Sequence, residues 1–126
     1  MKSKRDFILE TLLPYKLDPS TCAIDSSGYC EYLTEDGRKC AIGKHMLPGI
    51  WQKYSRPLVA LFMEYNKEEM LTKEANDMNL KNIEWYAIQH YHDSIAKKHA
   101  IISKEQAVIN IETTTGLKFP ELHFTE

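Results

Sequence analysis

The sequence lacks any long apolar run, and this absence argues against a membrane-spanning segment. A helix that crosses a bilayer needs about 18 or more consecutive apolar residues, and no segment of the 126 residues comes close. The basic start resembles the first part of a secretory signal, but the apolar stretch over residues 7–13 is short and contains Glu10 and Thr11. A signal peptide needs a longer apolar stretch and a cleavage site of small residues. We therefore expect a cytoplasmic protein.

The sequence also lacks an excess of positive charge. It has 16 Lys and Arg residues against 18 Asp and Glu residues, which gives a formal net charge of −2. Proteins that bind nucleic acid usually carry clustered Lys and Arg well in excess of acidic residues. Glycine-rich phosphate loops are missing as well, because the five glycines are scattered singly. Neither a nucleic-acid partner nor a nucleotide-binding motif is indicated.

Cysteine is scarce, and its pattern is not that of a secreted disulfide framework. The three cysteines, an odd number, are Cys22, Cys30 and Cys40, and no C-x-x-C pair occurs. The pair His92-Asp93 resembles a ligand pair of metal-dependent phosphohydrolases. Such sites need a further aspartate downstream, and Asp93 is the last aspartate of the chain. A structural histidine on a core-facing stripe, beside a solvated Asp93, is the favoured interpretation.

The composition is that of one ordinary folded domain. We expect this single domain to cover residues 1–126. Apolar residues make up 43% of the chain and charged residues 27%. Apolar spacing predicts a helix over residues 3–13 that stops at Pro14, and a second after an N-cap at Ser55. The charged stretch 66–79 is expected to contribute no core element. Two further helices are predicted, one over about 83–98 and one from a capping box at 103–106 to Gly116.

A β-hairpin is predicted around Asp36-Gly37, which is a favoured turn sequence between strands. The flanking runs contain aromatic and branched residues, and a turn centred near Glu35 would set Cys30 nearly opposite Cys40. The predicted class is therefore α+β, mostly helical, with about four helices packed around one short hairpin. A tail of uncertain order follows from residue 118.

The hairpin pairing leaves three interpretations of Cys30 and Cys40. They are a disulfide, a shared metal, or buried thiols that pack as small apolar side chains. Zinc prefers four ligands, and the candidate set is Cys30, Cys40, His45 and His92, with Cys22 or His90 as substitutes. A cysteine nucleophile with one of these histidines as base is a further hypothesis. No cofactor other than zinc is suggested.

Aromatic residues are numerous for one small core, and Trp and Tyr are favoured at interfaces. We expect a binding surface or a homo-oligomer interface. The following residues are its candidates: Tyr29, Tyr32, Arg38, Lys39, Trp51 and Trp85.

The segment from Cys30 to Gly43 resembles a signature of small phage and prophage proteins. In those proteins it reads C-x-Y, a short loop, then G-x-x-C-A-[VI]-G, and a later helix often carries an apolar-Gln-x-x-His-Asp run, as residues 88–93 do here. Where such proteins continue into Leu-Ile-Pro, this chain has residues 44–48, Lys-His-Met-Leu-Pro. The resemblance implies a phage-type accessory protein in a bacterial cytoplasm, and it supplies no catalytic residue.

Three functional hypotheses follow. The first is stoichiometric binding to a host protein or a small signalling molecule, for example against a defence system. The second is a small zinc- or thiol-dependent enzyme built on Cys30, Cys40, His45 and His92. The third is a component of a virion or of its assembly.

Overall fold

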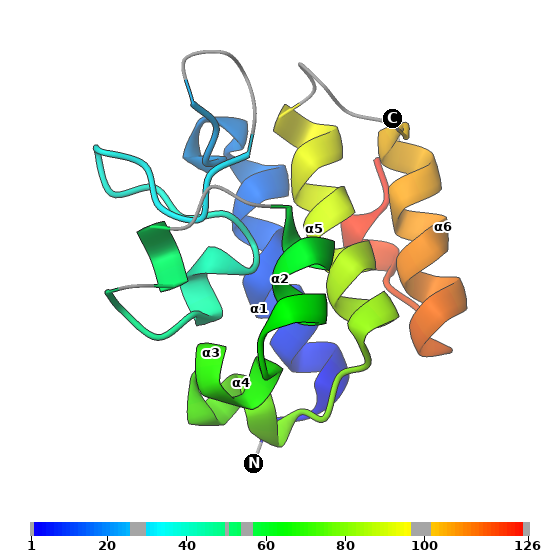
Figure 1. Cartoon of the computed structure of the whole chain (residues 1–126). Coiled ribbons are helices and arrows are strands. Elements are labelled where there is room, and N and C mark those ends of the chain that lie inside the picture. Colours follow the sequence, from blue (N-terminus) through cyan, green and yellow to red (C-terminus); the bar gives the residue numbers. More distant parts are fainter. Residues whose placement is uncertain (1, 26–29, 50, 54–56, 97–101, 125–126) are drawn as a thin grey trace.

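The computed structural model describes residues 2–25, 30–49, 51–53, 57–96 and 102–124. Within these ranges the chain forms six α-helices and four short 3₁₀ helices. The α-helices are α1 (Lys4–Leu17), α2 (Leu58–Glu64), α3 (Lys67–Met70), α4 (Lys73–Asp77), α5 (Asn82–Ala96) and α6 (Lys104–Thr115). Figure 1 shows α1, α5 and α6 side by side, with the described loop residues 18–25, 30–49 and 51–53 gathered on one flank.

Helix α5 is the centre of the fold. It packs most extensively on α6, and α1 and α2 also contact it. The prediction that His92 lies on a core-facing stripe of this helix is confirmed, because Trp85, Ile88, His92 and Ile95 are all buried. Burial of apolar area on several sides of one helix is the main stabilising contribution in such an arrangement.

Helix α6 has the predicted boundaries. The Ser103 hydroxyl accepts a hydrogen bond from the amide of Gln106 at 3.1 Å, as an N-cap does. At the other end Gly116 adopts φ 74°, the left-handed conformation that glycine tolerates best. After it the tail is ordered up to residue 124, since Phe119 and Leu122 are fully buried.

Helix α1 runs past Pro14, so the predicted stop at that residue is wrong. A proline in a helix removes one backbone hydrogen bond. Here the next residue, Tyr15, is buried in the core, and the amide of Asp18 bonds the Pro14 carbonyl at 2.9 Å. These contacts offset the lost bond and carry the helix to Leu17.

The stretch 66–79 does contribute to the core, contrary to the prediction. It forms α3 and α4, which begin at Asn66 and Thr72 caps, and it buries Met70, Leu71 and Ala75 almost completely. Most of the charged residues between these positions, such as Glu68, Glu69 and Lys73, are exposed. For α2, the predicted cap at Ser55 lies outside the described residues, and the helix follows Pro57.

The α+β class and the β-hairpin are wrong. In the part of the chain that the structure describes there are isolated bridges, among them Leu33 with Lys39, but no strand. The Asp36-Gly37 turn exists, because the amide of Gly37 bonds the Thr34 carbonyl at 3.1 Å and Gly37 has φ 89°. Strand pairing does not continue beyond the bridge of Leu33 with Lys39. The chain turns inward at residues 40–42, which are fully buried, and then enters a 3₁₀ helix at Gly43–His45.

Candidate functional site

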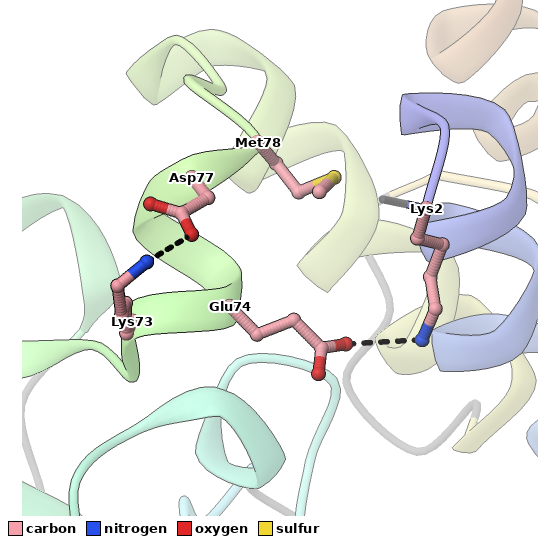
Figure 2. Close-up of a pocket in the computed structure, with 5 residues that line it drawn as sticks. All are labelled: Lys2, Lys73, Glu74, Asp77 and Met78. Carbon is pink, nitrogen blue, oxygen red and sulfur yellow. Dashed lines mark hydrogen bonds and ion pairs between the residues drawn. The ribbon is translucent and has the colours of Figure 1, made fainter.

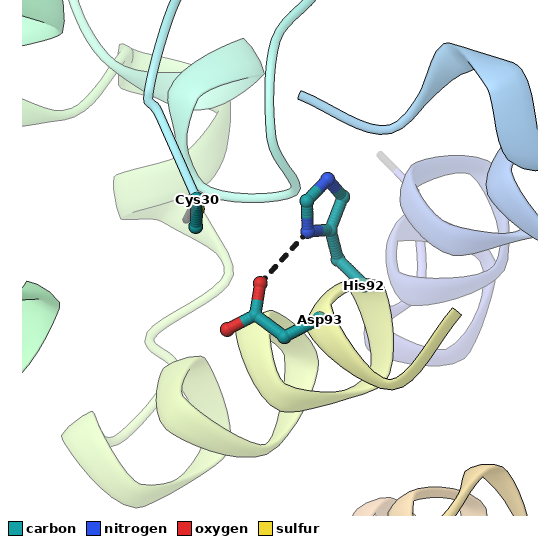
Figure 3. A group of neighbouring side chains, drawn as sticks. All are labelled: Cys30, His92 and Asp93. Atoms are coloured by element: carbon teal, nitrogen blue, oxygen red, sulfur yellow. Dashed lines mark hydrogen bonds and ion pairs between the residues drawn. The ribbon is translucent and has the colours of Figure 1, made fainter. Parts of the chain in front are cut away.

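A polar cluster joins the loop segment 22–43 to helix α5. The helix contributes Gln89, His92 and Asp93, whose spacing of three and four residues puts them on one face. The loop contributes Cys30, and Figure 3 shows it beside His92 and Asp93. Ligand atoms of Cys30, His92 and Asp93 all lie within 4.8 Å of one another. The structure thus brings together three of the groups that carry chemistry in this sequence.

His92 is fully buried, and both of its ring nitrogens are engaged. The backbone amide of Ala23 donates to Nε2 at 3.0 Å, so Nε2 acts as an acceptor. Nδ1 then carries the proton of a neutral ring and donates to Asp93 Oδ1 at 2.9 Å. A nitrogen that already accepts a backbone N–H is not available to take a proton from a thiol or to bind a metal. His92 therefore positions Ala23 and Asp93.

Gln89 is the hub of the cluster, and sequence reasoning gave it no role. Its side-chain amide donates to Asp93 Oδ1 at 2.9 Å and to the sulfur of Cys30 at 3.1 Å. Its carbonyl oxygen accepts from the amide of Ile42 at 3.2 Å. In a hairpin the N–H of Ile42 would bond the opposite strand, but here it bonds the Gln89 side chain of helix α5. The sequence could have indicated a shared role for Gln89, because it precedes His92 by three residues and so lies on the same face of the helix.

The thiols of Cys30 and Cys40 interact with each other. Cys30 is exposed as a residue, but its sulfur accepts from Gln89 of α5, and a hydrogen bond with Cys40, together with burial, raises the pKa of the Cys30 thiol. The amide of Gly43 donates to the sulfur of Cys40 at 3.3 Å. All three cysteines are free thiols, and burial raises the pKa of Cys22 to about 11. Thiols with a raised pKa, such as those of Cys22 and Cys30, are poor nucleophiles at neutral pH.

The turn over residues 40–43 requires glycine at position 43. A Cβ atom at this position would lie 1.9 Å from the carbonyl oxygen of Tyr32. The backbones of the two loop segments thus approach each other where only glycine fits. The loop is fixed further by the Tyr15 hydroxyl, which donates to the Lys39 carbonyl at 2.5 Å, and by Arg38, which donates to the Cys22 carbonyl at 2.8 Å.

His45 does not belong to this cluster. Its Nε2 donates to the hydroxyl of Thr11 at 2.7 Å, and its ring packs on Phe7 with centroids 4.5 Å apart. Burial lowers the pKa of His45 to about 4, so the ring is neutral at pH 7. The predicted ligand set is therefore split, since Cys30 lies beside His92 and interacts with Cys40, while His45 packs on α1.

The six surface candidates are also divided by the structure. Tyr32 and Trp85 are 5% and 1% exposed, so neither can contact a partner in this fold. Lys39 is exposed, and Arg38 and Trp51 are half-buried, with the Trp51 ring edge-on to Tyr65 at 5.0 Å. Tyr29 lies outside the described residues. Of the five candidates that the structure describes, Tyr32 and Trp85 therefore do not belong to an exposed surface.

A hollow of about 380 Å³ lies near the N-terminus, between Lys2 and α4 (Figure 2). Opposite charges on its wall are paired, with Lys2 3.0 Å from Glu74 and Lys73 2.8 Å from Asp77. Small-molecule sites are usually lined mainly by apolar side chains with a few polar groups. A lining of paired charges, with Met78 as its apolar member, is a weak candidate for such a site.

No protein family, curated protein or solved structure matches this chain. Among the described helices, none combines the length and apolar character that crossing a membrane requires. The two segments that carry the resemblance to phage proteins do meet in space. The Gln-x-x-His-Asp run of α5 contacts Cys30 and Ile42 of the other segment directly.

Proposed function

We propose that this chain is a stoichiometric binding protein, and that α2 with the first turn of α5 forms its contact face for another protein. The observation that carries the proposal is the exposure of large apolar side chains there. Met63 is 81% exposed and Val59 48% exposed, and on α5 Ile83 is 59% exposed. Single exposed apolar residues are ordinary, but several on adjoining elements are typical of an interaction surface.

Contacts between the two helices support treating these residues as one face. The rings of Phe62 on α2 and Tyr86 on α5 lie 5.9 Å apart. Lys67 lies over the Phe62 ring and also donates to Asn82, the residue before Ile83, at 2.6 Å. We call this surface, formed by Val59, Met63, Ile83 and the half-buried Tyr86, the α2 face. Figure 1 shows α2 lying against α5 on the side away from α6.

A protein partner is favoured over a small signalling molecule. The hollow beside Lys2 is lined by paired charges, whereas the α2 face offers apolar side chains that protrude, such as Met63. Methionine is adaptable and common at protein-binding surfaces. The resemblance to phage and prophage proteins supports a bacterial partner and a cytoplasmic setting.

The enzyme hypothesis has less support. Its general base would be His92, whose ring nitrogens are engaged by Ala23 and Asp93. If its nucleophile were Cys22 or Cys30, that thiol would have a raised pKa. General base catalysis requires a nitrogen free to take the proton.

The test is affinity capture from bacterial cytoplasm with three tagged chains: wild type, Met63→Glu and the control Ile109→Glu. Ile109 is 47% exposed but lies on α6. We expect one bacterial protein to co-purify in a nearly equal molar amount with wild type and with the control. A charge at the centre of an apolar contact should weaken retention by about tenfold or more.

Two results would contradict the proposal. One is the absence of any partner from the wild-type capture at high expression. The other is equal retention by Met63→Glu. A concentration-dependent dimer of the purified chain that Met63→Glu disrupts would instead assign the α2 face to a second copy.

A further inference from the structure

We propose that the protein partner of the α2 face binds as an amphipathic helix and presents a Lys or Arg side chain to Asp93 of α5. This inference rests on the proposed function, and it extends the contact surface along α5 from Ile83 to Asp93. It specifies two properties of the partner, which are the sign of one charge and the distance of that charge from the apolar contact residues.

The side of α5 that is accessible to solvent begins in the α2 face and ends at a carboxylate. Four residues spaced by three, four and three positions share this side of the helix: Ile83, Tyr86, His90 and Asp93. Helical residues at these spacings lie in one line along the helix. All four are at least partly exposed, with Ile83 59% exposed and the side chain of Asp93 34% exposed. A partner that lies along this line therefore meets apolar residues first and a charge at the far end.

Asp93 forms no ion pair with a Lys or Arg side chain of the described residues. Its Oδ1 accepts from Nδ1 of His92 and from the side-chain amide of Gln89, each at 2.9 Å (Figure 3 shows the first of these bonds). Both donors are neutral, because Nε2 of His92 accepts the N–H of Ala23 and so carries no proton. These bonds hold the carboxylate in place without supplying positive charge. A fixed carboxylate of this kind suits an ammonium or guanidinium group, since charge-assisted hydrogen bonds are stronger than neutral ones.

The length of this line sets the spacing that the partner must match. Asp93 follows Ile83 by ten positions, and a helix rises about 1.5 Å per residue, so the two positions lie ~15 Å apart along α5. A partner helix that packs along α5 covers this distance in about ten residues. Its apolar residues should recur at positions i, i+3, i+4 and i+7, as in other helices that bind a protein surface, with Lys or Arg about seven to eleven positions from the first.

The charges of α3, which follows α2 in the chain, favour the same kind of partner. Glu68 and Glu69 are exposed there. Lys67, which precedes them, is engaged by the carbonyl of Leu80 at 3.1 Å and by the side chain of Asn82 at 2.6 Å. Complementary charge steers a basic partner toward such a surface and disfavours an acidic one.

The experiment selects a displayed library of helical peptides, with apolar residues at i, i+3, i+4 and i+7 and random residues elsewhere, on the purified full-length chain. Parallel selections use wild type, Asp93→Asn and the control Glu105→Gln, which removes an exposed carboxylate from α6. Asparagine keeps an oxygen that can accept from Gln89 and His92, so Asp93→Asn removes the charge alone. Wild type and the control should enrich Lys or Arg at the expected spacing, and Asp93→Asn should not.

One enriched peptide then tests the charge pair directly. Its affinity for Asp93→Asn should be about tenfold lower than for wild type. Replacing its Lys or Arg with Gln should weaken binding to wild type by a similar factor and leave binding to Asp93→Asn unchanged, as expected for two groups that act as one pair. The peptide variant tests the pair even if Asp93→Asn does not fold.

The outcomes separate this inference from the proposed function. A selection without binders, or peptides that bind Met63→Glu as tightly as wild type, would contradict the α2 face and with it the role of Asp93. Peptides that require Met63 but show no preference for Lys or Arg would overturn the role of Asp93 alone. The same holds if the Gln replacement in the peptide leaves its affinity for wild type unchanged, or if Glu105→Gln weakens binding as much as Asp93→Asn.

Discussion

Replacing Gln89 with leucine tests how the loop of residues 22–43 is held on helix α5. The two side chains are similar in size, so the change removes hydrogen bonds without opening a large cavity. In the wild type the Gln89 carbonyl accepts from the buried amide of Ile42 at 3.2 Å. The Gln89 amide donates to Asp93 at 2.9 Å and to Cys30 at 3.1 Å.

The expected loss of stability depends on which hydrogen-bonding groups the substitution leaves without a partner. The Ile42 amide would lie in a fully buried position without an acceptor, which costs about 1–3 kcal/mol. The half-exposed Asp93 keeps its bond from His92 and can bind water, so its lost bond contributes about 1 kcal/mol or less. We predict that Gln89→Leu lowers the free energy of unfolding by about 1–4 kcal/mol.

Urea unfolding of the two chains, read by far-ultraviolet circular dichroism, measures this difference. The matched control is Gln106→Leu. Among the contacts described, the exposed side chain of Gln106 bonds only Asn110, so its loss should cost about 0.5 kcal/mol or less. Hydrogen exchange at the Ile42 amide should speed up in Gln89→Leu. If Gln89→Leu is as stable as Gln106→Leu, the hub role of Gln89 is refuted.

Three further predictions concern Gly43, Tyr15 and His45. Gly43→Ala should destabilise the fold by about 3 kcal/mol or more in thermal unfolding, because its Cβ would lie 1.9 Å from the Tyr32 carbonyl oxygen; a wild-type midpoint would contradict the close approach. Tyr15→Phe should cost about 1 kcal/mol, since the Lys39 carbonyl loses its donor, and an unchanged urea midpoint would show that this bond contributes nothing. The pKa of His45 falls from 6.5 to about 4 on folding, so between these pH values the unfolded chain binds a proton that the folded chain does not. Stability should therefore be lost as pH falls from 6.5 to 4, by about 3 kcal/mol in total, and His45→Gln should flatten this dependence; an equally steep profile in the variant would refute the assignment.

The helices with strong local signals could be predicted from the sequence. The stripe of α5 and the cap residues of α6, Ser103 and Gly116, are determined by residues close together in the chain. The failures depend on tertiary contacts. Pro14 does not end α1 because Tyr15 packs in the core, and no local pattern reports that contact.

The prediction of a β-hairpin is wrong for a related reason. Asp36-Gly37 does make the turn, but strand pairing needs N–H groups that are free to pair, and the amide of Ile42 bonds Gln89 on a helix 47 positions away in sequence. The same long-range contact decides the candidate site. The sequence indicated Cys30, Cys40 and His92 as a group, while the separation of His45 depends on its packing against Phe7.

The most direct test of the proposed function places a photoreactive phenylalanine analogue at Met63 and, in a second chain, at Ile109, followed by irradiation in bacterial cells. The account predicts that the chain modified at position 63 yields one dominant crosslinked species, and that Val59→Glu in the same chain abolishes it. The chain modified at position 109 should not yield this species. The same crosslinked species from both positions, or none from position 63, would contradict the assignment of the α2 face as the contact surface.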